Sequence, residues 1–302
     1  MHVTLRQLQV FSAVASHGSF TKAAKELNLT QPAVSMQVKQ LEEQIQTPLF
    51  EHLGKRIFLT DAGQEVFHTA KVVLQQLDDL GAVLDEMMGL ERGRLRIAAI
   101  STANYFVPRL LGTFCKRHEG VNVALDVTNR TAVLNQLAEN VADMAVMGTP
   151  PSDTELEAAP FMDNPVVIVA PPDHPLAEVK DIPLKRLEEE TFLIREPGSG
   201  TRNAMKRFFD EHGLKLNTGM EMSSQVAIKQ SIEAGLGLGM IQKDAIEMEL
   251  RLGRLVILDV ADTPVQRHWY LVHRKGKRLS AAAQAFKDFV LGEAADLLKA
   301  ER

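Results

Sequence analysis

The chain has 302 residues, a formal net charge of −5 and a single cysteine, Cys115. This length is too great for one small core and suits two or three units of about 100 residues each. One cysteine excludes an intrachain disulfide and a thiolate metal cluster. The sequence contains no run of 18 apolar residues and no N-terminal signal pattern. We therefore expect a cytoplasmic protein of several domains that does not enter a membrane.

Residues 19 to 45 have the pattern of two short helices joined by a tight turn. Ser19 is placed to cap the first helix, and Thr30 to cap the second, in which Pro32 falls where a missing N–H costs nothing. Apolar residues recur at helical spacing in both helices and are expected to face a core: Phe20, Ala23, Ala24 and Leu27 in the first, Val34, Val38, Leu41 and Ile45 in the second. The pattern favours a helix-turn-helix whose second helix lies in a DNA groove.

The other face of the second helix is polar and small. Glutamine can pair bidentately with adenine, serine can contact several bases, and the helix N-terminus attracts phosphate. The DNA-binding candidates on this helix are Thr30, Gln31, Ala33, Ser35, Gln37, Lys39 and Gln40. The alternative is a surface helix-turn-helix in an ordinary helical protein.

Positive charge is concentrated at the N-terminal end of this acidic chain. Residues 1 to 60 carry six Lys or Arg against four Asp or Glu, a net charge of +2. Lys55 and Arg56 form a turn between the apolar segments 49–51 and 57–59, which predicts a β-hairpin wing reaching backbone phosphates or the minor groove. The alternative is a solvated turn that happens to be basic.

A heptad pattern follows the wing. Its a and d positions are Val66, Ala70, Val73, Leu77, Leu80, Leu84 and Met87. A helix over about 62–88 would be roughly 40 Å long, and the same helix of a second subunit is the simplest partner for its apolar seam. Packing of the helix on its own subunit is the alternative. The segment 89–93, Gly-Leu-Glu-Arg-Gly, is expected to end the helix, which divides the chain into domains at 1–60, 61–92 and 93–302.

Predicted strands and helices alternate after residue 93. The predicted strands are 95–100, 121–127, 144–147, 166–170, 191–194, 216–222, 238–241, 255–258 and 269–273, and the predicted helices are 105–116, 132–140, 201–211, 224–234, 243–250 and 280–298. This order predicts parallel sheets with helices on both faces.

Ligands of such sheets bind where strands end beside helix N-termini. Two corners meet that description: Ser101 with Thr102, and the Gly-rich turn that carries Arg195, Ser199, Thr201 and Arg202. A simple capping turn is the alternative at each corner. Weaker candidates at other strand or helix ends are Asn129, Arg130, Thr149, Gln225, and Ile241 with Gln242. Hydroxyls, amides and arginines with few aromatic residues favour a small anion as the ligand.

The N-terminal motifs resemble those of LysR-type transcriptional regulators. The resemblance rests on residues 5–11, 18–20, 23–24, 29–35, 41–42, 49–50 and 59–63. It implies an α+β multi-domain protein with a winged helix-turn-helix, a linker helix that pairs in a dimer, and a C-terminal α/β effector domain resembling periplasmic binding proteins. That domain would have one lobe of about 93–162 with 267–302 and another of about 163–266. A homodimer or homotetramer would then bind a double-stranded operator with dyad symmetry.

Four further segments, 101–110, 129–130, 147–151 and 195–202, resemble the CbbR-type regulators of RuBisCO operons. That resemblance implies an activator that responds to a phosphorylated sugar or nucleotide and acts with RNA polymerase. Regulators of cysteine, nitrogen or inorganic-carbon genes with a carboxylate effector are the alternative. We expect no catalytic residue, metal or cofactor, because HExxH, GxSxG, CxxC and GxGxxG motifs are absent. A small-molecule binding protein without a regulatory role is the alternative from a different class.

Overall fold

The computed structural model describes residues 3–54, 56–87, 93–152 and 155–300. The chain divides into two compact units, residues 1–87 and 88–302, and each is described separately. The wing residue Lys55 and most of the expected helix break at 89–93 lie outside the described residues, as do the side chains of Arg56, Leu84 and Met87. Within the described residues, no helix has the length and hydropathy needed to cross a bilayer.

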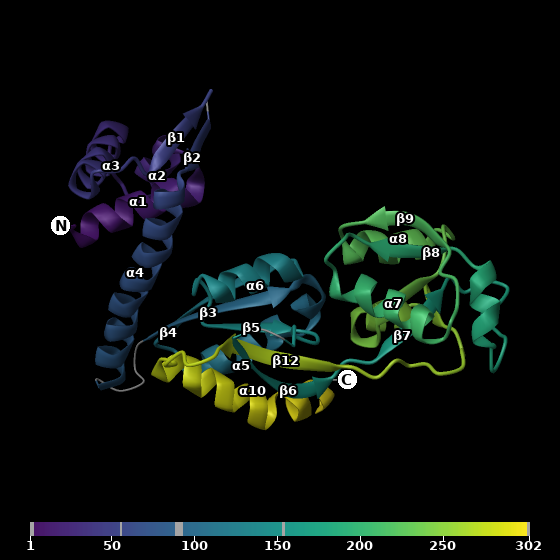
Figure 1. The fold of residues 1–302 in the computed structure, drawn as a ribbon. Coiled ribbons are helices and arrows are strands. Elements are labelled where there is room, and N and C mark those ends of the chain that lie inside the picture. The colour runs from purple at the N-terminus through teal and green to yellow at the C-terminus, as the bar shows by residue number, and fades with distance from the viewer. Residues whose placement is uncertain (1–2, 55, 88–92, 153–154, 301–302) are drawn as a thin grey trace. The chain divides into compact units, whose positions relative to one another are not determined.

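The first unit is a three-helix head with a hairpin and a long helix (Figure 1). Its elements are α1 (Leu5–His17), α2 (Phe20–Glu26), α3 (Gln31–Ile45), β1 (Phe50–Leu53), β2 (Arg56–Leu59) and α4 (Asp61–Met87). Phe11 is fully buried at the centre of the head, with its ring 5.2 Å from that of Phe50 on β1. Aromatic packing thus joins the helices to the antiparallel hairpin β1–β2.

The capping residues expected from the sequence begin α2 and α3. The Ser19 hydroxyl accepts a hydrogen bond from the Lys22 amide, and the Thr30 hydroxyl accepts one from the Ala33 amide. Val34, Val38 and Leu41 are buried against the head. These contacts fix the orientation of α3 and leave its polar face outside the core.

The hairpin joins α4 through a close backbone approach. The Thr60 hydroxyl donates to the Pro48 carbonyl oxygen at 2.8 Å and accepts from the Gly63 amide at 3.0 Å. A Cβ at Gly63 would lie 2.1 Å from the carbonyl oxygen of Leu49. A glycine is therefore required in this first turn of α4, because any side chain would collide with the backbone beside β1.

The apolar seam of α4 has two different environments. Val66 packs against the core of the head and Ala70 is fully buried. Further along, Leu77 and Leu80 are 41% and 53% exposed. The first part of the seam therefore packs on its own unit, whereas the described side chains of its second part lie open to solvent.

The second unit is built from two lobes, each with a sheet between helices. The first lobe has a five-stranded sheet in the order β4-β3-β5-β12-β6. Its strands are β3 (Gly93–Ile100), β4 (Val121–Thr128), β5 (Met144–Met147), β6 (Leu156–Asp163) and β12 (His268–Arg274). Two helices, α5 (Val107–Arg117) and α10 (Ala281–Ala300), share one core with the sheet, and α6 (Arg130–Ala138) packs in a separate core with β5 and β12 (Figure 1). The short 3-10 helix η1 (Ser101–Tyr105) directly follows β3.

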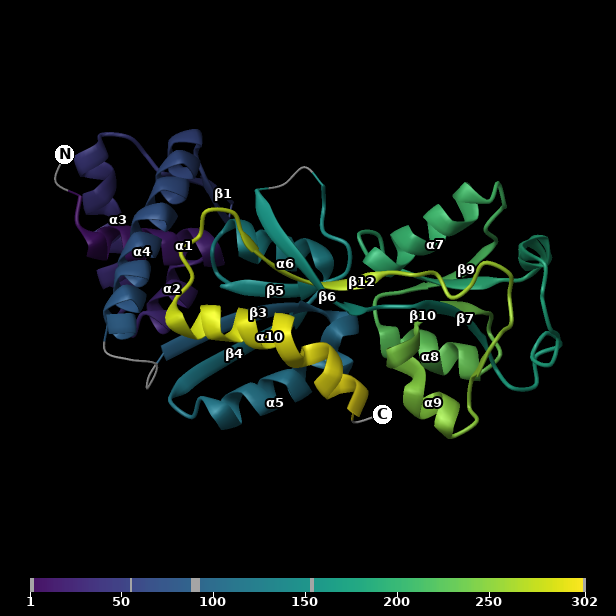
Figure 2. The same ribbon diagram turned by 90° about the horizontal axis from the view of Figure 1, so that it is seen from below.

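The second lobe surrounds a three-stranded sheet, β10-β7-β11, beside the parallel pair β8–β9. Its strands are β7 (Val166–Ala170), β8 (Phe192–Arg195), β9 (Thr218–Met222), β10 (Gly239–Gln242) and β11 (Val256–Ile257), and a bridge between Phe192 and Leu238 connects the two groups. Its helices are the 3-10 helices η2 (Leu184–Glu189) and η3 (Lys243–Ile246) and the α-helices α7 (Gly200–Glu211), α8 (Gln225–Glu233) and α9 (Glu247–Arg251). Figure 2 shows α7 on one side of the strands and α8 with α9 on the other.

The sheets differ from the sequence prediction in strand direction. β3 pairs in parallel with β4 and β5, but β12 runs antiparallel to β5 and β6, and β7 runs antiparallel to β10 and β11. The prediction of parallel sheets was therefore wrong for these strands. β6 was not predicted at all. It contains Pro160 and lies at the edge of its sheet, where a proline is tolerated and the apolar alternation is weak.

Candidate functional site

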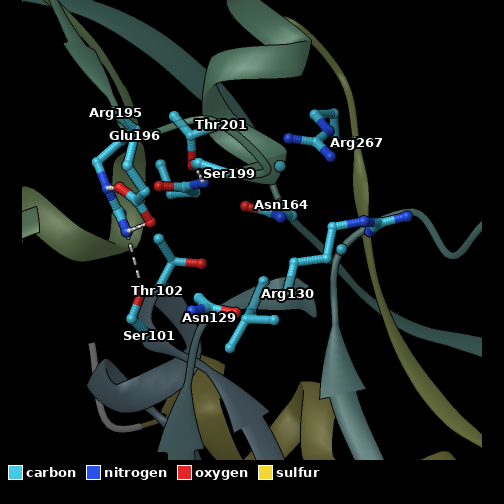
Figure 3. A pocket seen from close by; sticks show the side chains of 14 residues that line it. Ser101, Thr102, Asn129, Arg130, Asn164, Arg195, Glu196, Ser199, Thr201 and Arg267 are labelled. Carbon is cyan, nitrogen blue, oxygen red and sulfur yellow. Dashed lines mark hydrogen bonds and ion pairs between the residues drawn. The ribbon is translucent and has the colours of Figure 1, made fainter. Parts of the chain in front are cut away.

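A polar cavity lies between the two lobes of the second unit (Figure 3). Its volume is about 430 Å³, part of which is open to solvent. The lining residues come from strand ends, helix N-termini and the segments that connect the lobes: Ile100, Ser101, Thr102, Asn129, Arg130, Gly148, Asn164, Arg195, Glu196, Ser199, Gly200, Thr201, Gln242 and Arg267. A small polar molecule fits this lining better than an aromatic one, since no aromatic side chain contributes to it.

One end of the cavity offers hydroxyls and backbone amides. Ser199 is the N-cap residue of α7, but its side chain does not cap the helix, so the first amides of the helix keep free hydrogen-bonding capacity. The Gln242 side-chain nitrogen donates to the Thr201 hydroxyl oxygen at 2.9 Å, which leaves the Thr201 proton free to donate. A helix N-terminus with these hydroxyls is a favourable place for an anionic group.

Among the residues that the structure describes, three buried polar atoms at the cavity have no hydrogen-bond partner. They are the Thr102 hydroxyl oxygen and the side-chain carbonyl oxygens of Asn164 and Gln242. A buried polar atom without a partner costs about 1–3 kcal/mol, and a rotated amide group can present N–H in place of oxygen. These three side chains are therefore positioned to gain hydrogen bonds when a ligand enters.

The Arg195 guanidinium is already neutralised. It donates to both carboxylate oxygens of Glu196, at 2.7 and 2.9 Å, and to the Gln225 side-chain oxygen at 3.2 Å. A weaker contact of 3.4 Å reaches the Ser101 hydroxyl on the other lobe. Arg195 is only 4% exposed. Its contacts join the lobes at this end of the cavity, while its charge is balanced before any ligand binds.

Arg130 and Arg267 lie on the opposite side of the cavity (Figure 3). The Arg130 guanidinium donates to the Thr149 carbonyl oxygen at 2.7 Å. Burial lowers the pKa of both arginines, and repulsion by Arg207 and Arg130 lowers the pKa of Arg267 further. Within the described part of the chain, neither guanidinium forms an ion pair with a carboxylate. The uncompensated positive charge of the cavity is therefore on this side.

The structure brings eight of the expected effector-site residues to this cavity: Ser101, Thr102, Asn129, Arg130, Arg195, Ser199, Thr201 and Gln242. Four others do not line it. Arg202 donates to the Arg195 carbonyl oxygen at 2.8 Å and forms an ion pair with Glu221, and Gln225 lies behind Arg195. Thr149 contributes a backbone contact to Arg130, and Ile241 points into an apolar core. Ile241 and Gln242 are adjacent on β10, so their side chains project to opposite faces.

The lining residues that the sequence did not identify as candidates are Gly148, Asn164, Glu196 and Arg267, besides backbone contributions from Ile100 and Gly200. Glu196 adjoins Arg195, and Gly148 adjoins Thr149, both of which were identified. Asn164 and Arg267 carry no such signal, because they lie in the connections between the lobes and not in a strand-to-helix turn.

The candidate DNA-binding residues of α3 form a separate surface on the first unit. Thr30, Gln31, Ser35, Lys39 and Gln40 are exposed, and Ala33 and Gln37 are half-buried. The Lys39 Nζ atom lies 3.8 Å from Glu43 Oε1. Such an exposed i,i+4 ion pair contributes little to stability. The side chains of Lys55 and Arg56 lie outside the described residues.

Two family models match the chain. The model described as "Bacterial regulatory helix-turn-helix protein, lysR family" matches residues 5–64, and "LysR substrate binding domain" matches residues 88–295. The RuBisCO operon transcriptional regulator of Allochromatium vinosum is 55% identical over 98% of both chains. These matches confirm the predicted family.

Two solved structures are similar to the chain. The regulatory domain of CcmR from Synechocystis PCC6803, solved in complex with 2-PG, is 40% identical with a TM-score of 0.64, covering 66% of this chain and 96% of that one. Full-length CbnR, solved with its target DNA, covers 95% of this chain and 99% of its own at 20% identity and a TM-score of 0.68, which supports the fold alone. These likenesses confirm the predicted order of helix-turn-helix, linker helix and α/β effector domain. The chain belongs to the LysR family and is a transcriptional regulator, not an enzyme.

Proposed function

We propose that this regulator controls RuBisCO genes in response to a small phosphorylated anion that binds between the lobes of residues 93–300. The relative from Allochromatium vinosum, with 55% identity over nearly the whole chain, supports the operon assignment. The CcmR domain solved with 2-PG supports 2-phosphoglycolate as the first effector to test. Activation of transcription, with RNA polymerase as a partner, is part of the same proposal.

The effector proposal rests on one observation: hydrogen-bonding groups lie at one end of the cavity, and positive charge lies at the other end. Ser199, Thr201 and the α7 N-terminus provide hydroxyls and amides at one end. Arg130 and Arg267 provide unpaired positive charge at the other end. A compact molecule with an anionic group at each end satisfies both, and 2-phosphoglycolate has a phosphate and a carboxylate.

We also propose that the exposed residues of α3 read the operator and that the open part of the α4 seam pairs with a second subunit. Gln31 and Ser35 are exposed in the first turns of α3, where helix-turn-helix proteins contact base edges. Leu77 and Leu80 are exposed on α4, and burial against an identical helix removes them from water. A symmetric dimer then requires an operator with dyad symmetry.

The experiment is calorimetric titration of 2-phosphoglycolate into the full-length wild type and Thr201→Val. The valine removes the hydroxyl but keeps the shape of the side chain, so the affinity should fall by about 1–3 kcal/mol, roughly 5- to 150-fold. Thr113→Val is the matched control. Its hydroxyl bonds to the Arg109 carbonyl oxygen on α5, and it is not a lining residue of the cavity. Equal affinities for the wild type and Thr201→Val would place the effector elsewhere.

A further inference from the structure

Two segments connect the lobes, and they run beside each other as a short antiparallel ladder. The first, Asn164 with Pro165, joins β6 to β7, and the second, 258–267, joins β11 to β12. The Asn164 amide donates to the Arg267 carbonyl oxygen at 2.7 Å. Val166 and Val265 exchange two backbone hydrogen bonds of 3.0 and 2.8 Å. A change in the angle between the lobes must bend this ladder, which makes it the hinge.

The hinge also forms part of the cavity wall. Asn164 is 2% exposed, and its side-chain oxygen has no hydrogen-bond partner in the described ranges. The Arg267 side chain lines the same cavity, and a Cβ at Gly148 would lie 3.1 Å from its terminal nitrogen. Figure 3 shows Asn164 between the Thr201 side and the Arg130 side of the cavity. Each of the two connecting segments therefore presents one polar side chain to a bound ligand.

One arginine from each lobe repels the hinge arginine. Arg130 begins α6 in the first lobe, and Arg207 belongs to α7 in the second. Both repel the Arg267 guanidinium, and this repulsion is part of what lowers the pKa of Arg267. Arginine stays protonated despite such shifts. Without a ligand, bringing the lobes together therefore concentrates three positive charges around the hinge.

We propose that Arg267 is an anion sensor in the hinge: a phosphate group bound between Arg130 and Arg267 removes the repulsion and stabilises a closed arrangement of the lobes. This inference rests on the proposed effector site and assigns the phosphate to its arginine side and the second anionic group to the hydroxyl end beside α7. The Glu196 carboxylate supports that orientation, because it balances Arg195 at the hydroxyl end and disfavours a dianion there.

This orientation of the ligand determines which molecules close the hinge. A ligand that keeps the phosphate but lacks the second anionic group still reaches Arg267 and closes the hinge. A carboxylate without a phosphate occupies the hydroxyl end and leaves the three arginines uncompensated. Closure of the lobes therefore requires a phosphate group. This is because an effector shifts the equilibrium between the open and closed arrangements only by its unequal affinity for the two.

Hydrogen–deuterium exchange of the full-length protein separates occupancy from closure. The amides of Asn164, Val166 and Val265 report on the hinge ladder, and the Asn203 amide, which donates to the Ser199 carbonyl oxygen at 3.1 Å, reports on the α7 end of the cavity. The probes are 2-phosphoglycolate, inorganic phosphate and glycolate, each at about ten times its Kd. A ligand at that concentration slows exchange that requires its release by about tenfold.

In the wild type, 2-phosphoglycolate should slow exchange both at the hinge and at α7. Inorganic phosphate should slow exchange at the hinge. Glycolate should slow exchange at α7 at most. Arg267→Gln should lose the slowing at the hinge while 2-phosphoglycolate still protects α7. Arg267→Lys, which keeps the charge, should restore part of the hinge response. Arg254→Gln is the matched control, because Arg254 is exposed, lies 3.9 Å from Glu233 and does not line the cavity.

Three results would overturn the inference. They are hinge protection in Arg267→Gln equal to that of the wild type, hinge protection by glycolate equal to that by phosphate, and an unchanged hinge in the wild type with inorganic phosphate. A hinge that responds to inorganic phosphate in a protein that does not bind 2-phosphoglycolate would support the sensor and refute the proposed effector. The two proposals therefore fail separately.

Discussion

Arg195 and Glu196 are consecutive in the chain and form a two-pronged ion pair in the wall of the cavity between the lobes, with N–O distances of 2.7 and 2.9 Å. A basic residue in a Gly-rich turn is expected to bind an anionic ligand, but here its charge is balanced by its neighbour. Arg202 is balanced in the same way by Glu221. Of the cavity's arginines, the carboxylates in the described part of the chain thus leave Arg130 and Arg267 uncompensated.

Glu196→Gln should increase affinity for small anions, because it releases the Arg195 charge into the cavity while the glutamine oxygen can still accept one of its hydrogen bonds. We expect an increase of about tenfold, the effect of one charge-assisted contact of roughly 1.4 kcal/mol. Glu221→Gln, which releases Arg202 away from the cavity, is the matched control. Titration of 2-phosphoglycolate measures both variants, and equal effects would show that the increase is only a change in net charge.

Gln31→Ala should weaken binding to the operator more than binding to random DNA, since a lost base contact costs about 1–3 kcal/mol and affects sequence recognition. Gln44→Ala provides a control with the same side chain on the last turn of α3, where Gln44 is also exposed. Gel-shift titration of both variants on both DNAs gives the answer. Identical losses of affinity for operator and random DNA would show that Gln31 contacts the DNA backbone and not a base.

Leu77→Asp should dissociate the dimer, because it places a charge in an apolar seam where no partner balances it. Leu77 is 41% exposed on α4. Val72→Asp is the control, since Val72 is 45% exposed on the same helix but lies off the seam. Sedimentation velocity at micromolar concentration should show monomers for Leu77→Asp and dimers for the wild type and Val72→Asp. A Leu77→Asp dimer would mean that subunits associate elsewhere.

Gly63→Ala should destabilise the DNA-binding head by at least about 1–3 kcal/mol, because the added Cβ collides with the Leu49 carbonyl oxygen at 2.1 Å. Gly112→Ala in α5 meets no atom within 4 Å and should raise stability by up to about 1 kcal/mol through helix propensity. Urea unfolding followed by circular dichroism compares the two. Similar stability of Gly63→Ala and the wild type would contradict the close approach.

The sequence predicted the parts of the fold that depend on local chemistry. Thr30 caps α3, and Val34 with Leu41 is buried beneath it, because capping and helical periodicity act within a few residues. Strand direction was not predictable in this way. β12 returns to the first lobe after the whole second lobe, and it pairs antiparallel to β5 and β6 through contacts distant in sequence.

The residues of the proposed effector cavity likewise divide into those that local sequence predicts and those that it does not. Thr102 and Thr201 were predicted because each follows a strand and begins a helix. Asn164 and Arg267 were not predicted, because their place in the wall depends on two connecting segments about a hundred residues apart meeting at the hinge. Arg202 was predicted but is held away by Glu221, a partner that only the folded chain brings near.

DNase I footprinting upstream of the RuBisCO operon from the same genome, with and without 2-phosphoglycolate, tests the central claim most directly. The full-length protein should protect a site with dyad symmetry, and 2-phosphoglycolate should change the extent of protection by altering the arrangement of the bound heads. Thr201→Val should protect the same site without responding to the ligand. A wild-type footprint absent from this region, or one that 2-phosphoglycolate leaves unchanged at saturation, would contradict the account.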